Sequence, residues 1–125
     1  MKNKPKYSFI KNTGYALKGF KDIVINETSF RIELILLPIV FLLIYLLDFQ
    51  FYEKLFLLSS YMLLLIVEAI NSAIERVVDL VTLEYNELAG KAKDAGSTAV
   101  FLTIVLNTIL WTIFIIGIIK WKEYI

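Results

Sequence analysis

The sequence predicts an all-α membrane protein, with three transmembrane helices and an N-terminal amphipathic surface helix, in a single domain over residues 1–125. Composition is the first reason: 58% of the 125 residues are hydrophobic and the mean hydropathy is +0.70, which is too apolar for an ordinary soluble domain. Second, three apolar runs have about the length that crosses a hydrocarbon core. Third, a segment with helical period, apolar on one side and basic on another, precedes the first run.

The surface helix is predicted over about residues 7–25. Its apolar residues share one face at spacings of 3, 4, 3 and 4, and its lysines gather on another face. The apolar face consists of Ile10, Thr13, Leu17, Phe20 and Val24, and the basic face of Lys11, Lys18 and Lys21. Such a helix lies in the interface of an anionic membrane or packs on the spans of its own domain, and both interpretations can hold together.

The three spans are predicted over about residues 30–47, 53–81 and 98–119. The first contains Pro38, which a membrane helix tolerates and which can kink it. The second would be roughly 45 Å long, more than a hydrocarbon core needs, so its acid-bearing end should reach the membrane interface. Because the connection between the first two spans, residues 48–54, is short, we expect them to form an antiparallel hairpin.

The distribution of lysine and arginine predicts the orientation of the chain. Ten of these residues lie before the first span or near the connection between the second and third, and three lie on the other side. By the positive-inside rule, the N-terminus and residues 80–97 are cytoplasmic and the C-terminus is outside. The lysine-rich N-terminus is not followed by an apolar core of about 7–15 residues, so we do not expect a signal peptide.

Two residue types that often carry chemistry are missing, because the sequence has no cysteine and no histidine. This excludes disulfides, thiolate nucleophiles, histidine bases and Cys₂His₂-type zinc sites, and leaves carboxylates, lysine and tyrosine for acid–base chemistry. Any metal should be a hard cation bound by oxygen, which favours Mg²⁺. No basic patch with interleaved aromatic residues indicates a nucleic-acid partner. Residues 14–19, GYALKG, imitate the start of a P-loop but lack its Gly-Lys-Ser/Thr ending and a preceding strand, so we reject that motif.

The most informative pattern is a polar stripe inside the second span. Its members, at spacings of 3, 4 and 4 and hence on one helix face, are Glu68, Asn71, Glu75 and Asp79. An ionised carboxylate at membrane depth costs roughly 3 kcal/mol on insertion scales, so three of them should face a partner, a cation or a cavity rather than lipid. The alternative is an ion-paired contact between subunits, or for Asp79 a solvated helix end. We take the polar stripe as the candidate functional site.

Two further groups lie on the same predicted side of the membrane. In residues 83–97 Lys93 stands beside Asp94, a reasonable pair for phosphate and metal, and Ser97 can cap the third span, whose N-terminal N–H groups attract anions. From composition alone, an ordinary charged loop with an N-cap is the better interpretation of this segment. Glu27, just before the first span, could converge with Glu75 to hold one Mg²⁺ that also binds substrate phosphates.

Three strings together resemble the small prokaryotic diacylglycerol kinase family: GYALKGFKDIVINE (14–27), EAINSAIERVVDL (68–80) and EYNELAGKAKDAGS (84–97). The resemblance covers about residues 7–119, and its E-x-x-N-S-A-I-E-x-x-x-D and K-D-x-G-S patterns are specific. It implies a homotrimeric enzyme of the bacterial cytoplasmic (inner) membrane, with active sites shared between subunits on the cytoplasmic side. Such an enzyme moves the γ-phosphate of MgATP onto the primary hydroxyl of diacylglycerol and gives phosphatidic acid.

The resemblance also implies residue roles. Glu68 would be the general base on the lipid hydroxyl, supported by Asn71, and Glu27 and Glu75 would coordinate Mg²⁺. The remaining roles are nucleotide contacts for Tyr15, Glu84, Asn86, Lys93 and Asp94, and places on the lipid-substrate side for Ser8, Ser97 and Trp111. Two positions depart from the family pattern: Ser8 stands where arginine is common, and Asn86 where some relatives have histidine. We expect altered substrate affinity from these changes.

Three competing interpretations remain. Undecaprenol kinases share the fold and use a long polyprenol acceptor, but after Lys-Asp they tend to lack the Gly96-Ser97 pair. A small ion- or proton-coupled transporter would place its acids near the bilayer midplane, whereas here they cluster toward one end. A non-catalytic scaffold would tolerate Glu68→Gln.

Overall fold

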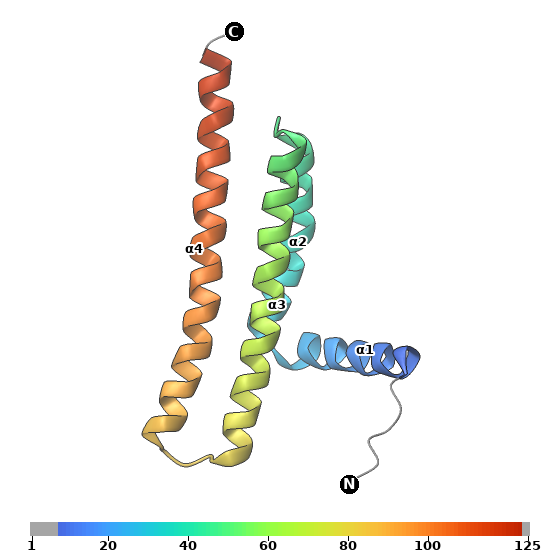
Figure 1. Cartoon of the computed structure of the whole chain (residues 1–125), viewed down its shortest axis with the longest axis vertical. Coiled ribbons are helices and arrows are strands. Elements are labelled where there is room, and N and C mark those ends of the chain that lie inside the picture. The colour runs from blue at the N-terminus through green and yellow to red at the C-terminus, as the bar shows by residue number, and fades with distance from the viewer. Residues whose placement is uncertain (1–7, 124–125) are drawn as a thin grey trace.

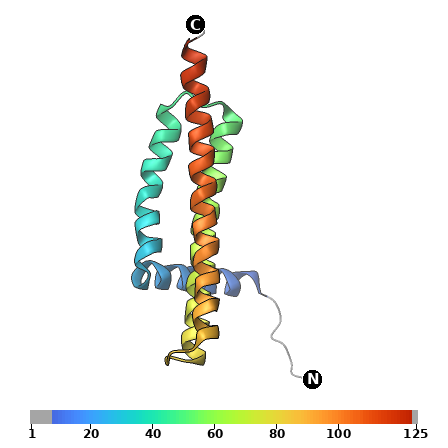
Figure 2. The same ribbon diagram turned by 90° about the vertical axis from the view of Figure 1, so that its left-hand side faces the viewer.

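The computed structural model describes the backbone of residues 8–123 and the side chains of residues 8–120. Over this range the chain is helical without any strand, and the helices are α1 (Phe9–Asn26), α2 (Thr28–Leu46), α3 (Phe51–Val81) and α4 (Glu87–Glu123). The last three run side by side, and α1 lies across them near one end of the bundle (Figure 1). The second view, turned by a quarter, has α4 in front of α3 along most of its length (Figure 2).

Three of the helices, α2, α3 and α4, are long and apolar enough to cross a membrane. This confirms the predicted all-α class and the three predicted spans. The first two spans begin two residues earlier than expected, and the first ends at Leu46 rather than at residue 47. The predicted surface helix is α1, which extends one residue further than expected, to Asn26; position 7 lies outside the described residues.

The prediction for the third helix was wrong at its start. We expected a loop over residues 83–97 and a helix capped by Ser97, but α4 already begins at Glu87. Asn86 supplies the cap, because its side-chain oxygen accepts hydrogen bonds from the backbone N–H groups of Leu88 (2.9 Å) and Ala89 (3.1 Å). The charged residues that suggested a loop instead make the first turns of α4 exposed, and Ser97 is an exposed residue inside the helix.

The junctions between the helices are short. Ser8 caps α1, accepting a hydrogen bond from the backbone N–H of Lys11. Glu27 is the only residue between α1 and α2, and its extended backbone turns the chain while its N–H still bonds to Ile23 (2.8 Å) and its carbonyl still accepts from Arg31 (3.2 Å). The turn therefore places the Glu27 side chain at the corner of the fold, beside α3.

Two apolar clusters hold the helices together. The first consists of Phe30, Tyr61, Leu64 and Leu65, and residues near the end of α1 pack against it. The second consists of Ile44, Phe49 and Leu57, with Trp111 of α4 packed against it. Most other apolar side chains of the three long helices are exposed, which is the surface expected of helices that face lipid or other subunits.

A fully bonded set of polar groups, the polar clamp (Ser60, Thr103 and Asn107), also joins α3 to α4. The Ser60 hydroxyl donates to the Asn107 side-chain oxygen (3.0 Å), and the Asn107 amide donates to the carbonyls of Ser60 (3.0 Å) and Thr103 (2.9 Å). All three residues are buried. Satisfied hydrogen bonds of this kind fix the register of two helices where apolar side chains alone would allow sliding.

Candidate active site

The polar stripe of α3 is buried at one end and exposed at the other. Glu68 and Asn71 keep 4% and 8% of their accessible surface, Glu75 is half-buried, and Asp79 is exposed. None of the four salt bridges within residues 8–120 involves Glu68. A carboxylate buried without a cation is costly unless substrate or metal compensates it, so the buried end of the polar stripe has the character of a site.

A second acid from α2 faces the same region. Glu33 lies close enough to Glu68 for the two carboxylates to repel each other, and its Oε2 is buried without a hydrogen-bond partner among the described residues. The Tyr61 hydroxyl donates to the backbone carbonyl of Glu33 (2.7 Å), which ties this turn of α2 to α3. Glu33 was not among the candidate site residues predicted from the sequence, because nothing in the chain's periodicity relates α2 to position 68.

Asn71 lies where α3 and α4 come closest. Its amide donates to Glu75 Oε1 (2.9 Å), and its Oδ1 is buried without a partner among the described residues. A Cβ added at Gly96 of α4 would clash with that oxygen, so any other residue at position 96 would displace the Asn71 side chain. Asn71 was expected to support Glu68, but its hydrogen bond goes to Glu75, one turn further along the same helix.

Glu27 is held by an arginine that sequence reasoning counted only for its charge. Arg76 of α3 donates from Nε (3.2 Å) and Nη2 (2.9 Å) to Glu27 Oε1, and from Nη1 to Asp22 of α1. The hydrogen bond from Arg76 holds the pKa of the Asp22 carboxyl below its ordinary value, although partial desolvation opposes the shift. Of the two carboxylates expected as metal ligands, Glu27 is bonded to Arg76 and Glu75 to Asn71.

Lys93 does not pair with its neighbour Asp94. Its Nζ lies 2.6 Å from Asp79 Oδ1, which links the exposed end of the polar stripe to α4. Asp94 and Ser97 are exposed on α4. Lys93 and Gly96 therefore approach the stripe because α4 packs against α3, rather than through a loop.

The other predicted contacts are not brought to the stripe within one chain. Tyr15 is exposed on α1, Glu84 is exposed in the segment between α3 and α4, and Asn86 caps α4. Ser8 caps the far end of α1. A single chain thus carries one compact set of acids around α3 and a scattered set of exposed polar residues on α1 and the α3–α4 connection.

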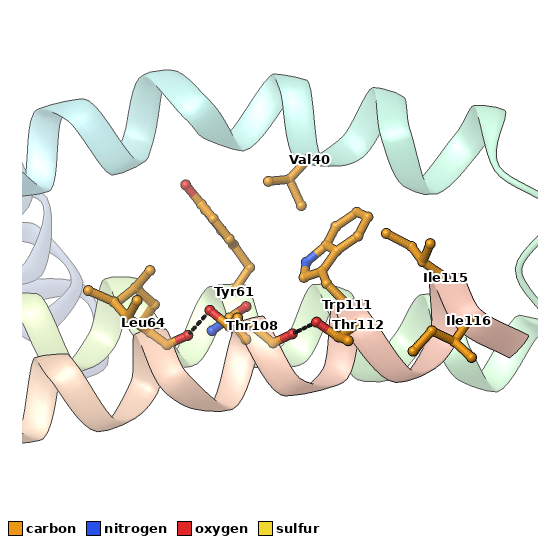
Figure 3. Close-up of a pocket in the computed structure, with 10 residues that line it drawn as sticks. Val40, Tyr61, Leu64, Thr108, Trp111, Thr112, Ile115 and Ile116 are labelled. Carbon is orange, nitrogen blue, oxygen red and sulfur yellow. Dashed lines mark hydrogen bonds between the residues drawn. The ribbon is translucent and has the colours of Figure 1, made fainter.

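An apolar groove of about 540 Å³ lies between α2, α3 and α4 (Figure 3). Trp111, which also stacks edge-on against Phe49 at 5.8 Å, and Tyr61 enter it from α4 and α3. Leu64, also in its lining, precedes Glu68 by one helical turn. The groove therefore runs along the helices toward the buried carboxylate, and its predominantly apolar lining suits a hydrocarbon chain.

The acidic side chains around α3 are candidate ligands for a metal ion. Within residues 8–120, no group of three or more acidic, histidine or cysteine side chains is arranged to hold a metal ion. Glu27 and Glu75 nevertheless suit Mg²⁺, which proteins usually hold through one or two carboxylates while phosphates and water complete the octahedron. The donor set fits a cation that arrives with a nucleotide rather than one caged by the protein alone.

Comparison with known proteins agrees with this chemistry. The family model described as prokaryotic diacylglycerol kinase matches residues 14–115. The chain is 44% identical to a diacylglycerol kinase of Escherichia coli K12 over 104 residues, 83% of this chain and 85% of that protein. It is 41% identical to one of Pseudomonas aeruginosa (84% and 85% covered) and 40% identical to one of Haemophilus influenzae (82% and 86% covered).

The three apolar helices and this similarity identify a multi-pass membrane protein. The buried carboxylate of Glu68 and an apolar groove whose lining reaches Leu64, one helical turn before it, are compatible with a kinase that acts on a lipid. The chain belongs to the prokaryotic diacylglycerol kinase family and is an ATP-dependent lipid kinase.

Proposed function

We propose that the protein transfers the γ-phosphate of ATP to the primary hydroxyl of diacylglycerol, giving phosphatidic acid, in a reaction that depends on Mg²⁺. The observation that carries this proposal is the apolar groove ending one helical turn from Glu68, a buried carboxylate without a cation among residues 8–120. A lipid whose chain occupies the groove would have its headgroup beside that carboxylate. In this proposal the lipid substrate lies beside Ser97 and Trp111 of α4 and beside Ser8.

Glu68 is the general base in this proposal. The hydroxyl oxygen of the lipid attacks the γ-phosphorus, the bond from that phosphorus to the bridging oxygen breaks, and ADP leaves. The hydroxyl proton passes to Glu68. Histidine, which could otherwise act as the base, is absent from the sequence. Phosphoryl transfer needs positioning and charge stabilisation more than covalent chemistry, so one base and a few charged contacts are sufficient.

Glu27 and Glu75 are the proposed Mg²⁺ ligands, and Asn71 orients Glu75 through its hydrogen bond. A bound Mg²⁺ would neutralise charge on the phosphate oxygens. Lys93 and Asp94 contact the nucleotide, as do Tyr15, Glu84 and Asn86 toward its adenosine end. To bind a phosphate of the nucleotide, Lys93 would break its ion pair with Asp79.

We further propose a homotrimer with active sites shared between subunits, in the bacterial inner membrane. The exposed apolar faces of the long helices and the dispersed nucleotide residues of α1 and the α3–α4 connection support an assembly that brings them together. In this arrangement α1 is an amphipathic helix in the interface: residues near its C-terminus pack on the bundle, and Ile10 and Leu17 remain exposed. The N-terminus and active site are cytoplasmic, and the C-terminus is outside.

Undecaprenol is the alternative acceptor, since an apolar groove also suits a polyprenol. The test is phosphate transfer from labelled ATP in mixed micelles, with diacylglycerol and undecaprenol offered in parallel over a range of Mg²⁺ concentrations. Labelled phosphatidic acid with little undecaprenyl phosphate supports the proposal, and the reverse yields change the acceptor. Product formation that is independent of Mg²⁺, or a Mg²⁺ titration unchanged by Glu27→Gln and Glu75→Gln, would remove the metal assignment.

A further inference from the structure

The ion pairs of Arg76 add too little stability to explain why an arginine stands at this place in the candidate site. It bridges Asp22 of α1 and Glu27 at the α1–α2 junction, and these three side chains are 45%, 45% and 24% exposed. Ion pairs exposed to this degree add little to stability, because water screens the charges and ordering long side chains costs entropy. The bridge holds α1 against α3, but weakly, so another use for the guanidinium is worth testing.

The guanidinium retains capacity for a further ligand. It has five N–H donors, and the bonds to Asp22 and Glu27 start from its three nitrogens, leaving donors on the terminal nitrogens without a partner among residues 8–120. Both bonds to Glu27 go to Oε1, so Oε2 is left for another contact. The planar fork of arginine matches pairs of phosphate oxygens better than the point charge of lysine does.

We propose that Arg76 binds the phosphates of the nucleotide, exchanging its contacts with Asp22 and Glu27 for phosphate oxygens of ATP. The inference rests on the proposed function, because that function places the nucleotide beside Glu27 and Glu75. Arg76 contacts Glu27, one of the two proposed metal ligands, directly, so a nucleotide whose Mg²⁺ is held by Glu27 would bring its phosphates near the guanidinium.

Charge balance supports this placement. The triphosphate of ATP brings several negative charges to a site whose own side chains are largely acidic, and Lys93 is the only basic residue that sequence reasoning assigned to it. In the structure Lys93 is paired with Asp79, and Arg76 with Asp22 and Glu27, so carboxylates hold both cations. Phosphate oxygens can replace these carboxylates, and Asp22 then acts as a competing anion for Arg76.

A matched pair of variants separates this role from a merely structural one. If the bridge only holds α1 in place, Arg76→Gln removes all of it and Asp22→Asn removes the Asp22 part, so both variants should change the kinetics in the same direction. If Arg76 binds phosphate, Arg76→Gln raises the KM for MgATP by about tenfold or more, because hydrogen bonds to charged groups are worth that much. Asp22→Asn then leaves this KM unchanged or lowers it, because a competitor has been removed.

The measurement is initial-rate kinetics of full-length protein in mixed micelles, varying MgATP and diacylglycerol separately. Arg76→Lys should recover part of the lost affinity for MgATP, and the KM for diacylglycerol should stay within about twofold of wild type in every variant. Lys54→Gln, on the opposite end of α3, controls for the loss of one positive charge. An increase in the KM for MgATP with Asp22→Asn, or no increase with Arg76→Gln, would overturn the proposal.

Binding of MgATP to detergent-solubilised wild type and variants, measured by calorimetry without lipid, keeps the two proposals distinguishable. If wild type phosphorylates no lipid, the proposed function fails, and weaker MgATP binding by Arg76→Gln alone still supports the phosphate contact. If wild type is active and the variants bind MgATP equally, the phosphate contact fails while the proposed function stands.

Discussion

The polar clamp and the polar stripe lie on the same pair of helices, and their hydrogen bonding differs. In the polar clamp, the side-chain groups of Ser60 and Asn107 are bonded to each other and to backbone carbonyls. In the buried half of the polar stripe, Glu68 has no cation and one oxygen of Asn71 has no partner within residues 8–120. Both regions are buried to a similar degree, so burial alone does not distinguish them.

The difference indicates two uses of buried polar groups. A satisfied group in an apolar surrounding specifies how two helices pack, and nothing is left to bind a substrate. An unsatisfied group costs free energy, and a folded protein keeps such a group mainly where function requires it. The polar clamp therefore has the bonding of a scaffold element, whereas the polar stripe, with Glu33 beside it, keeps unsatisfied groups such as the proposed active site would use.

The largest effect is expected for the unpaired acid of the stripe. Glu68→Gln should lower turnover by about 10²–10⁴-fold, because the amide cannot accept the hydroxyl proton, while MgATP binding and the melting temperature are retained. Turnover in mixed micelles and thermal unfolding in detergent check both parts. Glu53→Gln, the same change at the other end of α3, should be silent. Wild-type turnover in Glu68→Gln would remove the general base and the distinction between the two regions.

Next in size is the close approach of α4 to Asn71. Gly96→Ala should destabilise the protein by about 1–3 kcal/mol and lower activity, because the new methyl group displaces Asn71 and its hydrogen bond to Glu75. Gly90→Ala is the matched control in the same helix: nothing lies within 4 Å of its added Cβ, so better helix propensity should stabilise it by up to about 1 kcal/mol. Equal melting temperatures for the two variants would show that the helices do not meet at Gly96.

A smaller effect, on stability rather than chemistry, is expected for the polar clamp. Asn107→Leu should cost on the order of 1 kcal/mol, the range measured for hydrogen bonds between membrane helices. Turnover per folded molecule should stay near the wild-type value. Ser60→Ala alone and combined with Asn107→Leu forms a double-mutant cycle in thermal unfolding, and additive losses would mean that the two side chains do not interact.

The smallest effect concerns the pH dependence of the Asp22–Arg76 contact. Arg76 lowers the pKa of Asp22 in the folded protein, so this contact stabilises the fold above the carboxyl's unfolded pKa of about 4 and is lost as pH falls through the folded value. Wild type should therefore be slightly more stable than Asp22→Asn near pH 6, and the difference should shrink as the pH falls below the unfolded carboxyl pKa of about 4. Detergent melting curves across this pH range provide the measurement, and a difference that grows on acidification would reverse the sign.

Structural features that follow a regular spacing of residue types could be predicted from the sequence. The apolar runs specify α2 and most of α3 because membrane-spanning helices must satisfy their backbone internally, and the spacing of Glu68, Asn71 and Glu75 places them on one face wherever the helix goes. The sequence did not predict the start of α4, because the many polar residues between positions 87 and 97 favour a loop. They remain helical because Asn86 caps them and because the second half of the helix continues the same hydrogen-bond ladder.

What the sequence by itself determined is the helical class, the number of spans, the acid-bearing face of α3 and the restriction of acid–base chemistry to carboxylates, lysine and tyrosine. Only the tertiary structure decided which of these groups meet. Arg76 contacts Glu27 and Asp22 across 49 and 54 residues of chain, and Glu33 reaches Glu68 from another helix. Periodicity describes one helix at a time, whereas the partners of a buried charge depend on how helices pack. In this protein the packing of the helices depends on a glycine at position 96 and on the turn at Glu27.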